Sequence, residues 1–447
     1  MHGNDFTKGP VGKQIITFSI PIILGNLFMQ LYQVVDSVIV GRYLGKEALA
    51  AVGASMPVVF AVIALAIGIG SGASVVISQY FGAKQHDKVQ ATSDTLHIFL
   101  LGAGVLIAVL GFFFNAWILK LTGLPEDLIP MAEQYLIIFL GGIFLLFGFN
   151  TVTSILRGIG DSRTPLMFLV ISTILNIVMD LLFVVVFGWG VPGAAWATIV
   201  ASGAAYAIAL IYINRRGQII KINLLKLKFN SQIFKQCIKY GLPTGIQQSV
   251  VAIGGLVLMA VINPFGTTVI AGYTIAMRID ALATIPAINF AVALAGFVGQ
   301  NVGAGHQDRA KKGLGMTLLY SSLTCMAFTL VIILFGRNIL GLFTTDSDVI
   351  AVGLEYLVIV SSFYLLFSAM LTFNGMFRGS GAVIFPMFST LFSLWIIRIP
   401  VALWLSRSMG SEGIWWSIPI GWAVGLAMVL VYYKTGKWKN HSIFDSK

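Results

Sequence analysis

The chain has 447 residues, of which 57% are hydrophobic and only 10% are charged, and its mean hydropathy is +0.91. Soluble domains carry about 25% charged residues, so this composition excludes a water-soluble fold and makes the lipid bilayer the solvent. The net charge of +11 does not indicate nucleic-acid binding, because the basic residues are spread along the chain and do not gather with aromatic residues.

Apolar runs long enough to cross the ~30 Å hydrocarbon core recur along the whole chain. They predict an all-α polytopic membrane protein with twelve transmembrane helices. Because residues 1–13 are polar and lack the pattern of a secretory signal, we expect the first helix to be retained. The predicted spans are 14–40, 47–78, 91–116, 130–155, 163–188, 192–213, 233–262, 267–302, 313–336, 350–375, 383–406 and 412–433.

Lysine and arginine are distributed unevenly between alternate loops. With these spans, 21 of the 28 basic residues lie on the side of the N-terminus, three of them (Arg163, Lys235 and Lys239) in the first turns of spans that begin on that side. The opposite side holds only Arg42, Lys46, Lys120, Arg337 and Arg407. The positive-inside rule therefore predicts a multi-pass protein of the cytoplasmic (inner) membrane with both termini in the cytoplasm.

An internal repeat has an offset of about 221 residues. The segment 79–88 returns as 300–309, Arg157-Gly158-Ile159-Gly160 returns as Arg378-Gly379-Ser380-Gly381, and Gly45 corresponds to Gly266. Such agreement predicts two six-helix lobes, residues 1–220 and 221–447, with a cytoplasmic linker at about 214–232. Since six is an even number, the two lobes enter the membrane in the same direction, as parallel repeats. Two such lobes suit alternating access to a site near the membrane midplane.

Ionisable residues inside the predicted spans are few, and each is costly to bury, so each is a functional candidate. Those that we single out are Asp36, Asp180, Asp280, Arg278 and Arg398. Asn176 and Asp180 are four apart and share one helix face, and Asp36 and Thr198 lie at a similar depth in the outer half of the bilayer. These four residues form an all-oxygen set that suits either a hard cation such as Na⁺ or proton binding by a carboxylate pair.

The repeat provides a control for this set. With the offset of 221, the positions of the second repeat equivalent to Asp36, Asn176 and Asp180 are Val257, Ile397 and Val401. Restriction of the polar set to one lobe favours ion coupling over a structural hydrogen-bonded cluster. For Asp280, Arg278 and Arg398, structural pairing or snorkelling is favoured over a role in substrate access.

Amides follow the prolines of the first and seventh helices, Pro21 and Pro243. They are Asn26, Gln30, Gln33, Gln247 and Gln248. These side chains can line a central substrate cavity or mediate helix packing, and the sequence favours neither role.

Taken together, these motifs resemble the multidrug and toxic compound extrusion (MATE) family over nearly the whole chain. The matching residues are 36–42 with Gly45, 79–83, 157–165, Asn176 with Asp180, and 300–304. The resemblance implies a V-shaped pair of lobes that export organic cations or other amphiphilic compounds in exchange for H⁺ or Na⁺. It implies no cofactor other than the coupling ion, and we expect a monomer.

The family resemblance also implies that the coupling ion binds in the N-terminal lobe, at Asp36, Asn176, Asp180 and Thr198. Some branches of the family carry further acids on helices 7 and 10. Here helix 7 offers Gln247 and Gln248, and the only acid of helix 10, Glu355, lies near its outer end. This departure argues against a C-terminal sodium site.

Three other functions agree less well with the sequence. A lipid-linked oligosaccharide flippase of related fold is the alternative transporter, but it should have a basic central cavity, and the central charges here are mostly acidic. An enzyme is not expected, because the chain has no HExxH motif, no phosphate-binding loop and no metal-ligand cluster. A channel is disfavoured because no carbonyl filter or ring of charges repeats.

Overall fold

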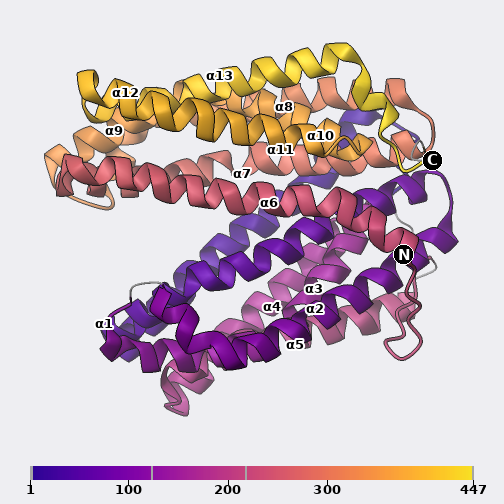
Figure 1. Cartoon of the computed structure of the whole chain (residues 1–447), viewed down its shortest axis with the longest axis horizontal. Helices are drawn as coiled ribbons and strands as arrows, with labels where there is room; N and C mark the ends of the chain where they lie inside the picture. The colour runs from indigo at the N-terminus through magenta and orange to yellow at the C-terminus, as the bar shows by residue number, and fades with distance from the viewer. Residues whose placement is uncertain (1–3, 122–123, 217–218, 445–447) are drawn as a thin grey trace. The chain divides into compact units, whose positions relative to one another are not determined.

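The computed structural model describes residues 4–121, 124–216 and 219–444. Within these ranges the chain is helical and forms no strand, which confirms the all-α prediction (Figure 1). The first half contains α1 (Val11–Gly82), α2 (His86–Leu121), a 3₁₀ turn η1 (Glu126–Leu128), α3 (Ile129–Gly158), α4 (Arg163–Asp180), a π-helical turn η2 (Leu181–Val186) and α5 (Gly190–Arg216).

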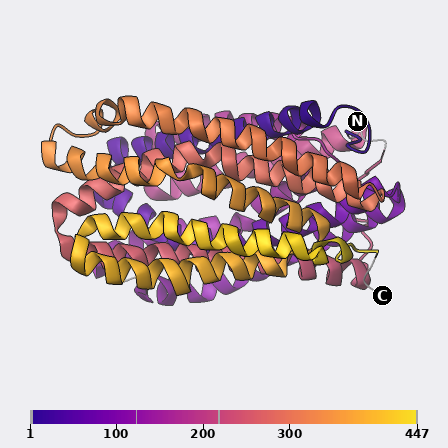
Figure 2. The ribbon, with the colours of Figure 1, turned by 90° about the horizontal axis from the view of Figure 1, so that it is seen from above.

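The second half begins with α6 (Ser231–Ile262), η3 (Asn263–Phe265), α7 (Thr267–Gly303), α8 (Gln307–Gly341), α9 (Ser347–Ser362) and α10 (Tyr364–Ser380). It ends with α11 (Ile384–Leu391), the π-helical η4 (Phe392–Arg398), α12 (Ile399–Met409), α13 (Ser411–Thr435) and η5 (Lys437–Asn440). Figures 1 and 2 show neighbouring helices of the second half, such as α7 and α8, lying side by side.

The predicted twelve spans are present in the described part of the chain. Ten helical segments are long and apolar enough to cross a membrane, and the bent pair α9 and α10 can supply another span. One of the ten, α1, contains two spans, because Gly45 leaves the helical conformation with φ 87° and ψ −178°. A side chain at this φ would be strained, so glycine marks the break between spans one and two.

The backbone repeats the duplication seen in the sequence. Gly266, 221 residues after Gly45, has φ 91° and ψ 173° and precedes α7. Lys84 (φ 59°) and Gly305 (φ 77°) form a second left-handed pair with the same offset, and Gly160 (φ 81°) and Gly381 (φ 96°) form a third. The two halves therefore turn at equivalent positions.

Two compact units make up the molecule, and each takes a short segment from the other half of the chain. The first comprises Leu24–Gly245 and the few residues before Phe6, and the second comprises Phe6–Ile23 and Ile246–Lys447. In both α1 and α6 the change of unit comes two residues after a proline, Pro21 or Pro243.

Within the first unit, α1 and the start of α6 approach closely through glycines. Gly68 and Gly72 face Gly245 and Gly241, and a Cβ atom on Gly68 or Gly72 would overlap the opposing backbone. Pairs of small residues four apart are the usual means by which membrane helices pack closely. This contact fixes the first turns of α6 to the first unit.

A second contact between small residues occurs once in each unit. In the first unit, Gly70 lies against Ser154 and Gly158 lies against the backbone at Ser74. Adding 221 to these numbers gives Ala291, Gly375, Gly379 and Ala295, and in the second unit Gly375 and Gly379 lie against the backbones of Ala291 and Ala295. The close packing of these helices is thus part of the repeat.

The segment at the predicted linker is held to the first unit. The Gln90 side chain exchanges two hydrogen bonds with the backbone of Lys221 at 2.8 and 2.9 Å. Asn214 does the same with Ile222 at 2.7 and 2.8 Å. Residues 217–218, which the linker prediction includes, lie outside the described residues.

Candidate functional site

The candidate site lies within the first unit, where polar side chains of three helices meet. The first span of α1 contributes Asp36, α4 contributes Asn176 and Asp180, and α5 contributes Thr198. Asn176 is 3% exposed and Asp180 is 1% exposed, whereas Asp36 and Thr198 are half-buried. The four residues predicted from the sequence are therefore brought together.

The Asn176 amide connects α4 to α5. With its nitrogen turned towards Asp180, it donates to Asp180 Oδ2 at 2.8 Å, and its oxygen accepts from the Thr198 backbone N–H at 3.2 Å. We describe the amide in this orientation because it satisfies both ends of the group. The Thr198 hydroxyl donates to the Ala194 carbonyl at 3.2 Å, which leaves its lone pairs available as acceptors.

The carboxyl groups of Asp36 and Asp180 are within hydrogen-bonding reach of each other. A hydrogen bond between two carboxyl groups requires a proton, because ionised carboxylates only accept. Asp180 Oδ1 is buried and has no donor among the described residues. The pair is thus arranged to hold a proton or a small cation.

Two tyrosines complete the surroundings of the carboxyl pair. The Tyr32 hydroxyl lies 3.5 Å from Thr198 Oγ1 and interacts electrostatically with both acids. Tyr135 of α3 is 3% exposed and also interacts with both acids and with Tyr32. The sequence interpretation missed both. Tyr32 precedes Asp36 by four residues on one helix face, which is a usable signal, but Tyr135 has no such local signal.

A π-helical turn, Leu181–Val186, begins directly after Asp180. It closes with hydrogen bonds from Phe187 N–H to the Leu182 carbonyl at 2.8 Å, and from Trp189 N–H to the Phe183 carbonyl at 2.9 Å. Turns of this kind inside membrane helices occur frequently at functional sites, because the wider turn changes the direction of the neighbouring side chains.

The equivalent positions of the second unit have aliphatic residues, but that unit has a half-buried acid elsewhere. Asp280 of α7 accepts a hydrogen bond from the Tyr364 hydroxyl at 2.5 Å and interacts electrostatically with Arg398. Arg278 is exposed on the same helix. Asp280 therefore has its own hydrogen-bond partner within the second unit.

The candidate cavity residues differ in their surroundings. In the first unit Asn26 is half-buried, and Gln30 and Gln33 are exposed. In the second unit Gln248 is exposed, whereas Gln247 is 5% exposed. The Gln247 amide donates to Thr390 Oγ1 at 2.6 Å and accepts from Arg378 at 2.8 Å, so its polar atoms are engaged within the unit.

A transition-metal site does not appear among the described residues, since no group of three or more His, Cys, Asp or Glu side chains is placed to hold a metal ion. The oxygens that remain available at the candidate site are those of the two carboxyl groups, the Thr198 hydroxyl and the Tyr32 hydroxyl. They match the chemistry of a proton or an alkali cation.

Comparison with known proteins agrees with this architecture. The MatE family model matches residues 21–182 and again 243–404, in keeping with the duplication. The chain is 32% identical over 448 residues to the "Probable multidrug resistance protein YpnP" of Bacillus subtilis, with 100% of both chains covered. It is 26% identical over 442 residues to the "Probable multidrug resistance protein NorM" of Thermotoga maritima, covering 97% of this chain and 94% of that protein.

Solved structures of the same family also resemble this chain. A multidrug resistance MATE family transporter of the MOP superfamily in an outward-facing conformation superposes with a TM-score of 0.91 at 26% identity, covering 98% of this chain and 99% of the other. A MOP superfamily transporter from Pyrococcus furiosus has a TM-score of 0.89 at 25% identity, covering 98% of each chain. The chain therefore belongs to the MATE family of multi-pass membrane transporters, and it is not an enzyme.

Proposed function

We propose that the protein exports organic cations and amphiphilic compounds in exchange for protons that bind at the Asp36–Asp180 carboxyl pair. The proposal rests above all on one observation, which is that these two carboxyl groups lie within hydrogen-bonding reach of each other inside one unit. The two relatives carry the name "probable multidrug resistance protein", which supports a range of substrates.

We choose protons over Na⁺ because a hydrogen bond between the Asp36 and Asp180 carboxyl groups requires a proton. Asn176 presents its amide nitrogen to Asp180 and its oxygen to the Thr198 backbone. In this orientation the Asn176 nitrogen holds the Asp180 carboxyl group in place, and the amide adds no oxygen ligand for a cation. We therefore assign Asn176 a positioning role, and Asp36 and Asp180 the proton-binding role.

The exchange of substrate for protons follows because the organic cation and the protons compete for the same two carboxylates. When both carboxyl groups are protonated the pair is neutral, and when they are ionised the like charges repel each other and attract a cation. An organic cation that approaches along the polar face of α1, past Gln30 and Gln33, is stabilised only after the protons leave. Alternating exposure of the pair to the two sides of the membrane turns this competition into antiport.

The location of the protein follows from the distribution of basic residues. We propose that the protein lies in the cytoplasmic membrane with both termini in the cytoplasm, since 21 of the 28 lysines and arginines lie on that side. We also propose that it acts as a monomer. The proton gradient across that membrane then drives export.

Proteoliposomes with pH and sodium gradients imposed separately test the proposal. Efflux of a fluorescent organic cation should follow an imposed pH difference and should be indifferent to a sodium gradient of equal size. Since a unit of pH corresponds to about 1.4 kcal/mol, a tenfold change in accumulation per transported proton is expected. Export that responds to sodium alone would refute the proton assignment.

A further inference from the structure

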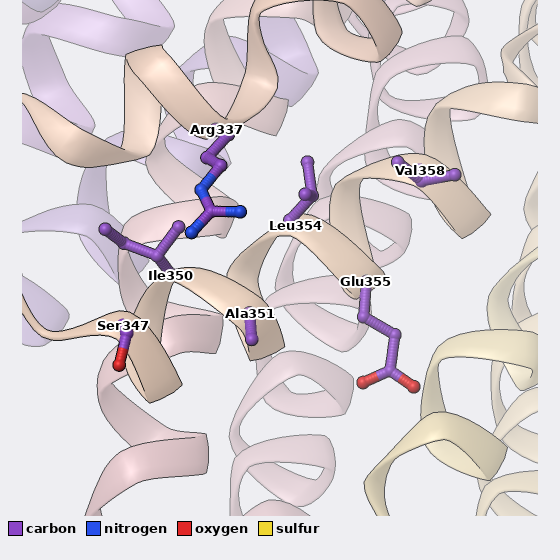
Figure 3. Close-up of a pocket in the computed structure, with 7 residues that line it drawn as sticks. All are labelled: Arg337, Ser347, Ile350, Ala351, Leu354, Glu355 and Val358. Atoms are coloured by element: carbon purple, nitrogen blue, oxygen red, sulfur yellow. The ribbon is translucent and has the colours of Figure 1, made fainter.

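A pocket of about 400 Å³ lies between α8 and α9, next to the loop that joins them (Figure 3). One side chain comes from the end of α8, Arg337, and the others come from the first three turns of α9. The lining residues are Arg337, Ser347, Ile350, Ala351, Leu354, Glu355 and Val358. All belong to the second unit and lie far along the chain from the carboxyl pair.

Opposite charges line this pocket without neutralising each other. Arg337 and Glu355 form no ion pair, and the ion pair found in the described part of the chain joins Lys311 to Asp308. Figure 3 shows the Arg337 guanidinium between Ile350 and Leu354, whereas the Glu355 carboxylate points away from it, beyond Ala351. Glu412, at the start of α13, adds negative charge near Glu355.

The rest of the lining is an apolar stripe. Ile350, Leu354 and Val358 are spaced four residues apart, so they lie one above another along a face of α9. Val358 is 37% exposed, and the loop beside the pocket exposes Leu342 by 83% and Phe343 by 52%. The pocket thus offers a positive charge near the loop, a carboxylate about two turns further along α9, and a hydrocarbon surface that runs along the span.

From this arrangement we infer that the pocket binds a phospholipid with a phosphoethanolamine head group. The planar guanidinium of Arg337 matches a phosphate. Glu355, with Glu412 nearby, attracts the primary ammonium, whose three N–H donors suit a carboxylate. One acyl chain lies along Ile350, Leu354 and Val358. A phosphocholine head group cannot donate hydrogen bonds to Glu355, and a phosphoglycerol head group lacks the cation that the carboxylates require.

The test compares lipids bound to the purified full-length protein in mild detergent, measured by native mass spectrometry and by the shift in melting temperature. Phosphatidylethanolamine should bind about tenfold more tightly than phosphatidylcholine or phosphatidylglycerol of the same chain length, as expected for one additional charge-assisted contact. Water-soluble glycerophosphoethanolamine should bind far more weakly, because it lacks the acyl chain. Equal binding of the three lipids, or a preference for phosphatidylglycerol, would overturn the inference.

Variants separate the two charged contacts. Arg337→Gln should weaken phosphatidylethanolamine binding about tenfold, and Glu355→Gln should remove the preference over phosphatidylglycerol. Ala351→Trp, which fills the pocket from an exposed position, should block the lipid entirely. Arg407→Gln is the matched control, because Arg407 is an exposed arginine at the end of another span and does not line the pocket. Unchanged binding in Arg337→Gln, or equal losses in Arg407→Gln, would show that the pocket has no head-group specificity.

Discussion

At the scale of the residue, the proposed coupling site depends on two carboxyl groups that lie within hydrogen-bonding reach of each other. We predict that Asp36→Asn and Asp180→Asn each abolish gradient-driven export while leaving the protein folded and inserted. Each amide removes one titratable group, and the remaining acid loses the like-charged neighbour on which proton exchange depends. Folding should suffer little, because a neutral amide costs less to bury than a carboxylate. Efflux from proteoliposomes and melting temperature in detergent measure the two effects, and normal transport by either variant would place the coupling site elsewhere.

Replacement of Asn176 is expected to reduce export less than replacement of either acid. Asn176→Ala removes the donor to Asp180 and the acceptor for the Thr198 backbone, but it leaves both carboxyl groups in place. Loss of such a hydrogen bond to a charged group costs about 1.5–3 kcal/mol, so we predict slowed but still proton-driven export. The transport rate at several pH values checks this, and complete loss would mean that the amide is itself required for exchange.

Asp280 provides the contrasting case in the second unit. Because it accepts from Tyr364 and lies near Arg398, we predict that Asp280→Asn chiefly lowers the melting temperature and spares transport. The loss should be about 1.5–3 kcal/mol, the value of a hydrogen bond to a charged group. A folded but inactive Asp280→Asn protein, beside active Asp36→Asn, would reverse the roles of the two units.

The sequence singled out four residues that the structure brings together, but it did not indicate their contacts. Asp36, Asn176 and Asp180 stand out because polar groups inside apolar spans are rare. Tyr135 could not be predicted, because tyrosine is common near membrane surfaces and its proximity to Asp36 arises only from the packing of α3. The direction of the Asn176 amide is likewise set by its neighbours on α4 and α5, which local spacing does not specify.

At the scale of the element, close helix packing through glycine has a direct consequence for stability. Gly72→Leu in α1 should lower the free energy of unfolding by about 1–3 kcal/mol, the usual cost of overpacking, because a side chain there overlaps Gly241. Gly53→Leu in the same helix is the control, since nothing lies within 4 Å of its added Cβ. Melting temperature checks both, and an equal loss of stability in the two variants would show that close approach does not determine the outcome.

Span positions could be predicted from hydropathy, but interruptions within spans could not. The predicted span 350–375 consists of α9 and α10, which meet at an angle of 51°. No proline or glycine lies at the bend. The Thr329 hydroxyl instead donates to the Ser361 carbonyl at 2.6 Å, so a side chain of α8 binds a carbonyl at the end of α9. The π-helical turns η2 and η4 have no local sequence signal either.

At the scale of the whole molecule, the duplication could be predicted from repeated motifs, but the exchange of segments between the units could not. The backbone N–H of Phe6 donates to the Gln300 side chain at 2.9 Å, and Arg309 donates to the Phe6 carbonyl at 2.8 Å. These contacts join residues about 300 positions apart. They arise from tertiary packing, which a periodic pattern of apolar residues does not report.

Two carboxyl groups also set an expectation for the charge moved in each cycle. If both protons are exchanged for one monovalent cation, one net charge crosses the membrane, and the potential contributes about 2.3 kcal/mol per 100 mV. Export of a monovalent cation should therefore accelerate when valinomycin and a potassium gradient impose a potential of the favourable sign. Efflux that ignores the imposed potential would indicate exchange of a single proton.

The central claim, that substrate and protons compete at the Asp36–Asp180 pair, is tested most directly by proton release from the purified protein. Addition of a cationic substrate to the protein in weakly buffered detergent should release protons, which a pH-sensitive dye reports. The account predicts release from the native protein and from Asp280→Asn, and none from Asp36→Asn or Asp180→Asn. Undiminished release from both of these variants, or its loss only in Asp280→Asn, would contradict the account.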